Sequence, residues 1–143
     1  AGLLHDIGKT KVNKSIINKE GPLNAQEWEE MKQHAQWGYE LVVGNPALTE
    51  RTQKAIVEHH EDRNGQGYPK GVKSDDLDVF SRIVCLADAF NALTTDRTYS
   101  KARTPFDAFQ FMNQKLSHKI DPELFRNLVL VYGGRLDPGG KPL

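Results

Sequence analysis

The chain has 143 residues, 38% of them hydrophobic and 27% charged, which is typical of one globular domain rather than of a disordered segment. Its 19 basic residues balance its 19 acidic residues, so the composition gives no indication of a nucleic acid polymer as partner. No apolar run approaches the roughly 18 residues of a membrane span and no signal peptide opens the chain, so the cytoplasm is the expected location.

Helical signals follow one another along the first half of the chain. Residues 1–7 resemble the interior of a helix with no capping residue before it, so we expect the chain to be a piece of a longer protein. Asn24 with Glu27 three residues later is the pattern of a capping box and predicts a helix that continues to the Asn-Pro pair at 45–46. A third helix is expected to end at residue 60, before a loop rich in Gly and Pro.

The second half of the chain predicts three more helices. The apolar residues 81–93 form one, and the pairs Thr104-Pro105 and Asp121-Pro122 each place a capping residue before a proline at the first helical position. The last helix is expected to end at residue 130 or 131. Residues 133–143, which hold four glycines and two prolines, are expected to be a flexible tail. The sequence therefore predicts an all-α fold.

Four of the five histidines fall at positions that could share a metal site. His5 precedes Asp6, His34 lies on the second predicted helix, and His59 and His60 are adjacent at the end of the third. Adjacent residues on a helix point about 100° apart, so such a pair can reach two metal ions. Imidazole and carboxylate together suit Fe, Mn, Zn or Ni better than Ca or Mg. Each histidine taken alone is more often an ordinary surface or core residue.

Asp88 adds weight to the metal interpretation. It lies within the otherwise apolar residues 83–90, where a carboxylate needs a strong partner to offset its loss of hydration. A helix cap or an ion pair with Arg82 or Arg97 would satisfy it. A metal ion would satisfy it too, and would also account for the histidines.

The motifs together resemble a known family. The order His…His-Asp…Asp is the signature of the HD superfamily of metal-dependent phosphohydrolases, and HDIGK at residues 5–9 resembles its central motif. HHE at residues 59–61 and NGQGYP at residues 64–69 resemble the HHE…DGxGYP element that names the HD-GYP subfamily. Residues 82–99 are also similar to that subfamily, so the resemblance covers about residues 5–122.

This resemblance implies both a fold and an activity. The fold is an HD-domain-like helical bundle over residues 1–132 that lacks the first helices of the family. The activity is that of a metal-dependent phosphodiesterase that hydrolyses cyclic di-GMP to linear pGpG, or further to GMP, in bacterial second-messenger signalling. The resemblance also implies an upstream receiver or sensor domain, other signalling proteins and a second copy of the chain as candidate partners.

Roles follow position by position from the family. Its metal ligands, which would hold two or three divalent ions with Fe or Mn foremost, match His5, Asp6, His34, His59, His60 and Asp88. Asp6 would bridge two ions and Lys9 would contact the scissile phosphate, which makes these two the catalytic candidates. The substrate-binding candidates are Lys9, Gly67, Tyr68, Pro69 and Arg97. Two metals about 3.5–4 Å apart can hold a bridging hydroxide for in-line attack, which agrees with these roles. Trp28 and Trp37 are expected to be packing or partly exposed aromatics without a base-stacking role.

The chain also departs from the family. It contains neither the histidine nor the glutamate that the family has upstream of His5, so we expect this piece to hold metal weakly, incompletely or not at all and to be a poor catalyst. We also expect exposed apolar surface, which would make the piece self-associate or leave it only marginally stable. Asn64 and Asn91 each stand where the family has an aspartate, and Ser100 where it often has a basic residue. Two alternatives stay open: an inactive HD-GYP signalling or interaction module, and an HD phosphohydrolase acting on another nucleotide.

Overall fold

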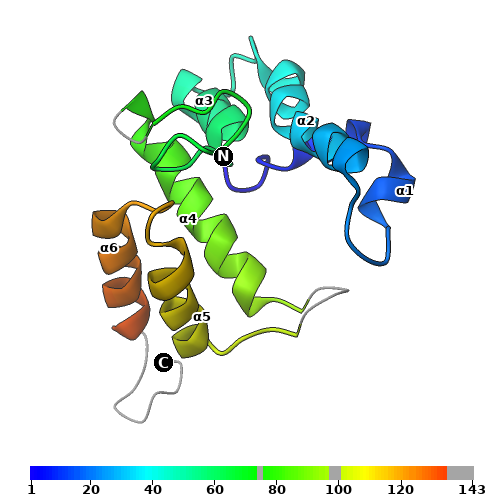
Figure 1. Ribbon diagram of the computed structural model, residues 1–143. Coiled ribbons are helices and arrows are strands. Elements are labelled where there is room, and N and C mark those ends of the chain that lie inside the picture. Colours follow the sequence, from blue (N-terminus) through cyan, green and yellow to red (C-terminus); the bar gives the residue numbers. More distant parts are fainter. Residues whose placement is uncertain (74–75, 97–100, 135–143) are drawn as a thin grey trace.

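The computed structural model describes residues 1–73, 76–96 and 101–134, and over these ranges the chain is helical without strands. In chain order the elements are the 3-10 helix η1 (Ile7–Lys11), α1 (Lys14–Ile17), α2 (Ala25–Val42), α3 (Glu50–Glu58), α4 (Val79–Thr94), α5 (Pro105–Phe111), the π-helix η3 (Met112–Leu116) and α6 (Pro122–Gly133). The prediction of an all-α fold is confirmed (Figure 1).

The capping signals in the sequence place the helix starts correctly. The side chain of Asn24 accepts a hydrogen bond from the amide of Glu27, and the carboxylate of Glu27 accepts one from the amide of Asn24, which completes the capping box of α2. Thr104 and Asp121 cap α5 and α6, each with a proline at the start of the helix. Local chemistry therefore decides where these helices begin.

Several helix limits differ from the prediction: α2 ends at Val42, before the Asn-Pro pair, and α4 begins at Val79 instead of residue 81. Residues 2–6 form turns instead of an α-helix interior and lead into the tight helix η1, because the backbone at Gly8 approaches α2 closely. α3 ends at Glu58, so His59 and His60 lie in the turn after it, and the carbonyl of His60 accepts from an amide of the following loop instead of continuing the helix. α6 runs to Gly133, beyond its predicted end, and residues 135–143 of the predicted tail lie outside the described residues.

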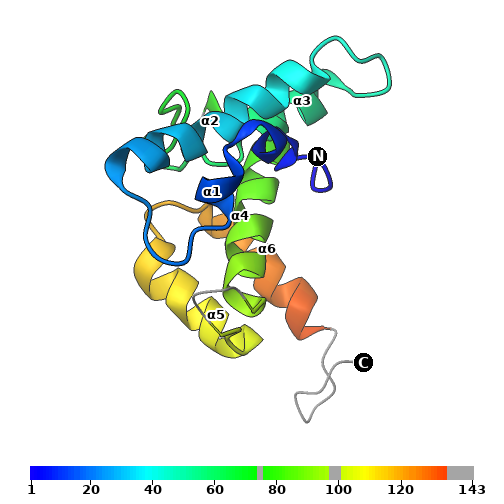
Figure 2. The ribbon, with the colours of Figure 1, turned by 90° about the vertical axis from the view of Figure 1, so that its right-hand side faces the viewer.

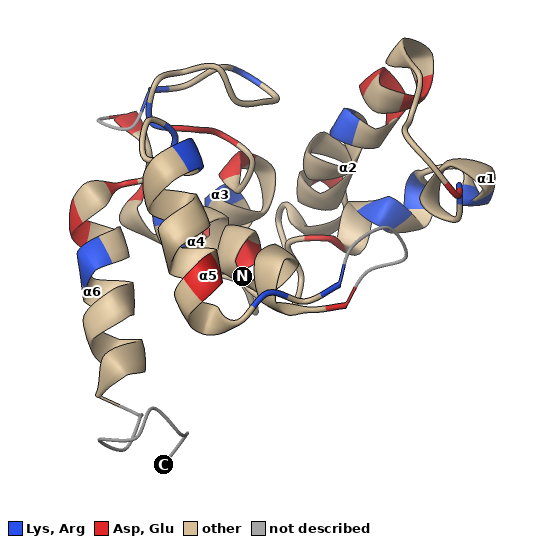
Figure 3. Cartoon of the chain, turned by 60° about the horizontal axis from the view of Figure 1, so that its bottom comes forward, with Lys and Arg blue, Asp and Glu red and all other residues tan. Residues whose placement is uncertain are grey.

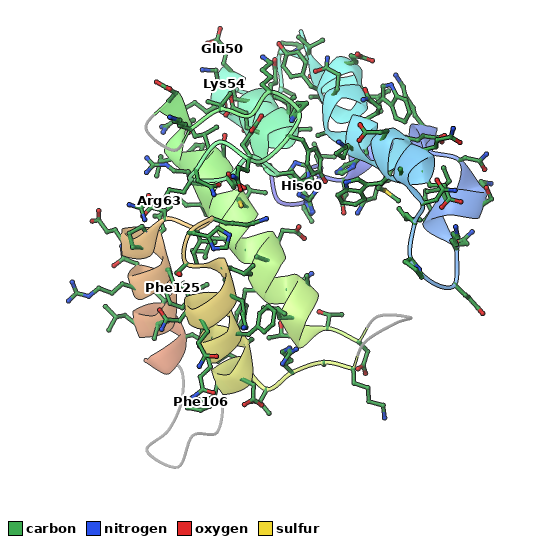
Figure 4. The ribbon with its side chains drawn as sticks, in the orientation of Figure 1. Glu50, Lys54, His60, Arg63, Phe106 and Phe125 are labelled. Carbon is green, nitrogen blue, oxygen red and sulfur yellow. The ribbon has the colours of Figure 1, made fainter. Side chains whose placement is uncertain are left out.

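α4 is the central helix of the molecule. In Figure 1, α2 and α3 lie above and to the right of it, and α5 and α6 lie along its lower left. The view in Figure 2 shows α2 crossing over the upper end of α4, with α5 and α6 beside its lower part. A core cluster of Leu86, Met112 and Ile120 joins the lower helices, and Phe125 on α6 packs against it (Figure 4). The upper layer, which includes η1, α2 and α3, positions the histidines of the predicted metal site.

The surface charges are mixed in sign. Figure 3 shows basic and acidic residues interspersed over the described helices. This distribution agrees with the balanced composition, because a protein that follows a nucleic acid polymer concentrates Lys and Arg on one face. Within the described residues, no helix combines the length and the apolar character that crossing a bilayer requires.

Candidate metal centre

The six predicted metal ligands come from separate segments and meet in one place. His5 and Asp6 lie on the turn before η1, His34 on α2, His59 and His60 directly after α3, and Asp88 on α4. Potential ligand atoms of Asp6, His34, His59 and His60 all lie within 4.8 Å of one another. His60 lies between α2 and α4 (Figure 4). Residues far apart in the sequence are thus brought within reach of a shared ion.

His5 links Asp88 to this cluster. Its Nε2 atom is 3.4 Å from Oδ2 of Asp6 and 3.7 Å from Oδ1 of Asp88. Arg82, one of the partners that the sequence offered for Asp88, is instead hydrogen-bonded to Asp121 at 2.5 Å. Arg97, the other partner, lies outside the described residues. Asp88 therefore faces the histidines, as the metal interpretation requires.

Hydrogen bonds to the main chain orient three of the imidazole rings. The Nδ1 atoms of His5, His34 and His59 lie 2.7, 2.6 and 2.8 Å from the carbonyl oxygens of Gly2, Met31 and Ile56. A carbonyl oxygen only accepts hydrogen bonds, so each Nδ1 carries a proton and donates it. In a neutral ring, as burial favours for His34 and His59, a proton on Nδ1 leaves a lone pair on Nε2, which is the atom that then binds a metal. The Nε2 atom of His5 faces two carboxylates and has to release its proton before it can bind an ion.

Three atoms face the centre of the cluster, and all three are hydrogen-bond acceptors without a donor among them. Nε2 of His34 is 3.3 Å from Nε2 of His59, and Oδ1 of Asp6 is 3.4 Å and 3.9 Å from these two nitrogens. Oδ1 of Asp6 is buried and, within the described part of the chain, accepts no hydrogen bond. An unsatisfied buried acceptor costs about 1–3 kcal/mol. A cation satisfies all three lone pairs at once, so this donor set fits a divalent metal ion of the Fe, Mn, Zn or Ni type.

Burial keeps three of the rings in the form that binds metal. It lowers the pKa of His34, and it lowers the pKa of His59 to about 4 and that of His60 to about 3, with the neighbouring imidazoles adding to both shifts. At neutral pH these rings therefore offer lone pairs and carry no positive charge.

Charged partners surround the carboxylate of Asp6. Hydrogen bonds first to Asp6 and then to Asp88 raise the pKa of His5 to about 10. Nζ of Lys9 lies 2.7 Å from Oδ2 of Asp6. Burial by itself would raise the pKa of Asp6, but the hydrogen bonds and charges of His5 and Lys9 together hold it well below its usual range. Asp6 is consequently ionised, as a metal ligand must be.

A cavity of about 450 Å³ opens beside the cluster. Gly67 and Tyr68 line it together with His59, His60 and Asp88. The Tyr68 ring stacks on that of His60, with centroids 4.7 Å apart and planes at 28°, and burial raises the pKa of its phenol, so the hydroxyl stays protonated.

Two of the predicted substrate contacts that the structure describes, Lys9 and Pro69, lie outside the lining of this cavity. Pro69 is exposed and lies outside the cavity lining, although the peptide bond before it is cis. Arg97 falls outside the described residues.

The close approach of the loop to the histidine pair requires a glycine at position 67, beyond what a simple turn would require. A Cβ atom built on it would be 2.4 Å from the carbonyl oxygen of His60 and 2.5 Å from Cα of Glu61. The loop can therefore lie against the histidine pair only if this position has no side chain. The glycine places the neighbouring Tyr68 on the ring of His60.

Glu61 organises the same loop and was not identified as a site residue from the sequence. Its side chain is almost fully buried, with the residue 2% exposed. Oε1 accepts hydrogen bonds from the amides of Lys70 at 2.7 Å and Gly71 at 3.1 Å, and Oε2 accepts one from Val72 at 2.9 Å. The sequence does show an acidic residue directly after the histidine pair. Its role could not be predicted, because the amides that it binds lie nine to eleven residues further along the chain.

We expect the substitution Glu61→Gln to lower the free energy of unfolding by about 1–3 kcal/mol. The amide group has one acceptor oxygen and brings an NH₂ donor against backbone N–H groups, so at least one buried donor loses its partner. Thermal denaturation measures the change, with Glu20→Gln at an exposed position as control. Equal melting temperatures for the two variants would show that the carboxylate does not hold the loop.

The fold and the cluster define a class: a helical domain built around a candidate metal centre of histidines and aspartates. The family described as HD domain matches residues 1–124. The chain belongs to the HD domain family.

Relatives and a solved structure agree with this membership. A 3'3'-cGAMP-specific phosphodiesterase of Vibrio cholerae is 38% identical over 129 residues, 90% of this chain and 28% of the relative. A cyclic di-GMP phosphodiesterase of Pseudomonas aeruginosa is 33% identical over 93% of this chain and 32% of the relative. The chain thus spans about a third or less of these relatives.

The solved structure shares the fold. It is described as a HDG"Y"P protein from Bdellovibrio bacteriovorus, and the two chains superpose with a TM-score of 0.72 at 22% identity. The match covers 92% of this chain and 42% of the other. The HD-GYP-like helical arrangement expected from the motifs is therefore the arrangement that this chain adopts.

Proposed function

We propose that the chain is the catalytic part of a metal-dependent phosphodiesterase that hydrolyses cyclic di-GMP to linear pGpG, or further to GMP, in bacterial signalling. One observation carries the proposal: imidazole lone pairs and an unpaired carboxylate oxygen of Asp6 converge beside a cavity large enough for a small-molecule ligand. The names of the Vibrio and Pseudomonas relatives, both phosphodiesterases for cyclic dinucleotides, support this class of substrate, and the name of the Pseudomonas relative supports cyclic di-GMP within it.

The proposed metal ligands are the six residues that converge: His5, Asp6, His34, His59, His60 and Asp88. Two or three divalent ions, with Fe or Mn foremost, are the proposed cofactors. Such ions act as Lewis acids and lower the pKa of bound water, which is the chemistry that phosphodiester hydrolysis requires.

Individual side chains at and around the proposed metal centre have proposed roles in catalysis and substrate binding. Asp6 is held ionised by His5 and Lys9, so it presents full negative charge to a cation. The ammonium group of Lys9 lies beside that carboxylate, where it can offset charge that builds up on a phosphate. The protonated hydroxyl of Tyr68 can donate a hydrogen bond to the substrate from the cavity wall. Roles for Pro69 and Arg97 stay predictions.

The asparagine at position 91, where the family has an aspartate, changes the candidate site less than the sequence suggested. Asn91 is exposed, accepts a hydrogen bond from the hydroxyl of Thr95 and lies outside the cavity lining. Its neutral side chain therefore removes no carboxylate from the cluster. This supports an active enzyme over an inactive signalling module.

Turnover of cyclic di-GMP, measured by separating the products, tests the proposal. We expect a chelator to reduce the rate to less than about 1% of that of the Mn- or Fe-loaded protein, and reloading to restore it. Binding without turnover under all metal conditions would favour the inactive module. Turnover of other nucleotides alone would favour a different HD phosphohydrolase. The metal content of the same samples checks the prediction that this piece holds metal weakly.

The cytoplasmic location, an upstream receiver or sensor domain, and a homodimer also stay predictions.

A further inference from the structure

The cavity extends well beyond the candidate metal centre. Its lining includes Trp28 and Lys32 of α2 on one side, and Leu116, Lys119 and Ile120 around the connection to α6 on another. In Figure 1 these two segments lie on opposite sides of α4. The volume of about 450 Å³ falls in the ~300–1,000 Å³ range of small-molecule sites, and only His59, His60 and Asp88 of the candidate metal ligands belong to the lining.

Trp28 is the most accessible aromatic ring of this cavity. The residue is 46% exposed, and its ring meets the ring of Tyr68 edge-on, with centroids 6.1 Å apart and planes at 81°. One face of Tyr68 is already covered by His60. An exposed indole on a cavity wall offers a flat apolar surface, and such a surface binds a nucleobase by stacking regardless of which base it is. From the sequence alone, Trp28 was expected to have no base-stacking role.

Lys119 supplies positive charge to the other wall. Its amide donates to the carbonyl of Leu116 and its carbonyl accepts from the amide of Arg63, both at 2.8 Å, so its backbone is tied to the loop that follows His60. Among the described residues, no carboxylate lies within 4.0 Å of its ammonium nitrogen. Lys32, by contrast, is paired with Glu29 at 2.7 Å.

The carboxylates that line the cavity already have partners. Glu61 accepts from three backbone amides, Asp62 accepts from the amide of Gln66, and Asp88 faces His5. Over the ranges that the structure describes, no carboxylate competes for the exposed ammonium group of Lys119, so it is available to a bound anion.

We infer that the cavity holds a whole cyclic dinucleotide through two contacts remote from the metal centre. One purine stacks on Trp28, and the phosphate that is not being cleaved lies against Lys119. This inference rests on the proposed function, since it takes the other phosphate to be at the metal centre, next to Lys9.

Binding of cyclic di-GMP in chelator tests the stacking contact without turnover. We expect Trp28→Ala to weaken binding about 10-fold or more, and Trp28→Phe to recover most of the loss because it keeps a ring. Leu41→Ala is the matched control, because Leu41 lies on the same helix with similar exposure, 48%, outside the cavity lining. 3'3'-cGAMP should lose affinity by the same factor, since stacking does not distinguish the purines.

Fluorescence gives an independent readout of the same contact. In a Trp37→Phe protein, Trp28 is the sole tryptophan. Its emission is expected to be quenched as cyclic di-GMP is added, because the base lies on the indole ring. A merely structural role for Trp28 would leave the emission unchanged.

The phosphate contact is tested by Lys119→Ala, with Lys115→Ala as the control on the preceding helix. We expect binding about 5-fold weaker at low salt for Lys119→Ala, and a difference that shrinks as added salt screens the contact.

Unchanged affinity in Trp28→Ala and Lys119→Ala, in a protein that still hydrolyses cyclic di-GMP, would overturn this inference and leave the proposed function standing. If the unmodified protein neither binds nor hydrolyses cyclic di-GMP or 3'3'-cGAMP, both fail.

Discussion

Replacing Asp6 by Ala is expected to abolish phosphodiesterase activity, with a loss of at least about 1,000-fold, while the protein stays folded. Asp6 is the carboxylate at the centre of the cluster, with Oδ1 near the Nε2 atoms of His34 and His59 and Oδ2 near that of His5. No other described carboxylate has this position. Its loss should therefore remove both bound metal and turnover.

The fold should tolerate this substitution. The side chain of Asp6 is 38% exposed, so its removal opens no buried cavity, and it also removes the buried Oδ1 atom that has no hydrogen-bond partner. Circular dichroism and thermal denaturation check the fold, metal analysis checks the centre, and Asp76→Ala at an exposed loop position is the control. Activity near that of the control would show that the cluster is not the catalytic site.

The substitution Gly8→Ala should lower the free energy of unfolding by about 3 kcal/mol or more. A Cβ atom at this position would lie 1.9 Å from the carbonyl oxygen of His34 and 2.4 Å from the amide nitrogen of Gly38. Both are backbone atoms of α2, so they cannot rotate away, and η1 would have to separate from the helix. Because His5, Asp6 and Lys9 flank Gly8, activity should fall with stability.

Denaturant unfolding measures this effect against two graded controls. At Gly2 an added Cβ meets nothing within 4 Å, so Gly2→Ala should be nearly neutral. At Gly38 the nearest atom is a methyl group of Ile56 at 3.0 Å, a side-chain atom that can shift, so Gly38→Ala should have an intermediate effect. If Gly8→Ala unfolds like Gly2→Ala, the close contact between η1 and α2 is not a feature of the protein.

The helices could be predicted from the sequence because their starts depend on neighbouring residues. Asn24 with Glu27, Thr104 with Pro105 and Asp121 with Pro122 act through bonds within one turn of chain. The end of α3 could not be predicted in this way. It depends on the hydrogen bond between the carbonyl of His60 and the amide of Tyr68, which forms only once the loop has folded back.

The candidate ligands could also be named from the sequence, because its motifs resemble those of a family with known metal ligands. Their ionisation could not be predicted, since it depends on burial and on which neighbours face each group. The low pKa of His60 and the high pKa of His5 arise from opposite surroundings within one cluster. The same reason explains why the sequence did not indicate the hydrogen bonds of Glu61 or the place of Trp28 and Lys119 in the cavity lining. Each has its partners, or the cavity that it lines, in a different segment of the chain.

The sequence by itself determined the all-α class, the helix caps and the residue types that suit a metal ion, because these are set by local hydrogen bonding and by side-chain chemistry. Only the tertiary structure decided that the lone pairs of His34 and His59 face the unpaired oxygen of Asp6. The same packing placed Trp28 and Lys119 around one cavity. Both depend on the distances between η1, α2, α3 and α4, and those distances follow from packing contacts such as that of Gly8 on α2, which no local pattern encodes.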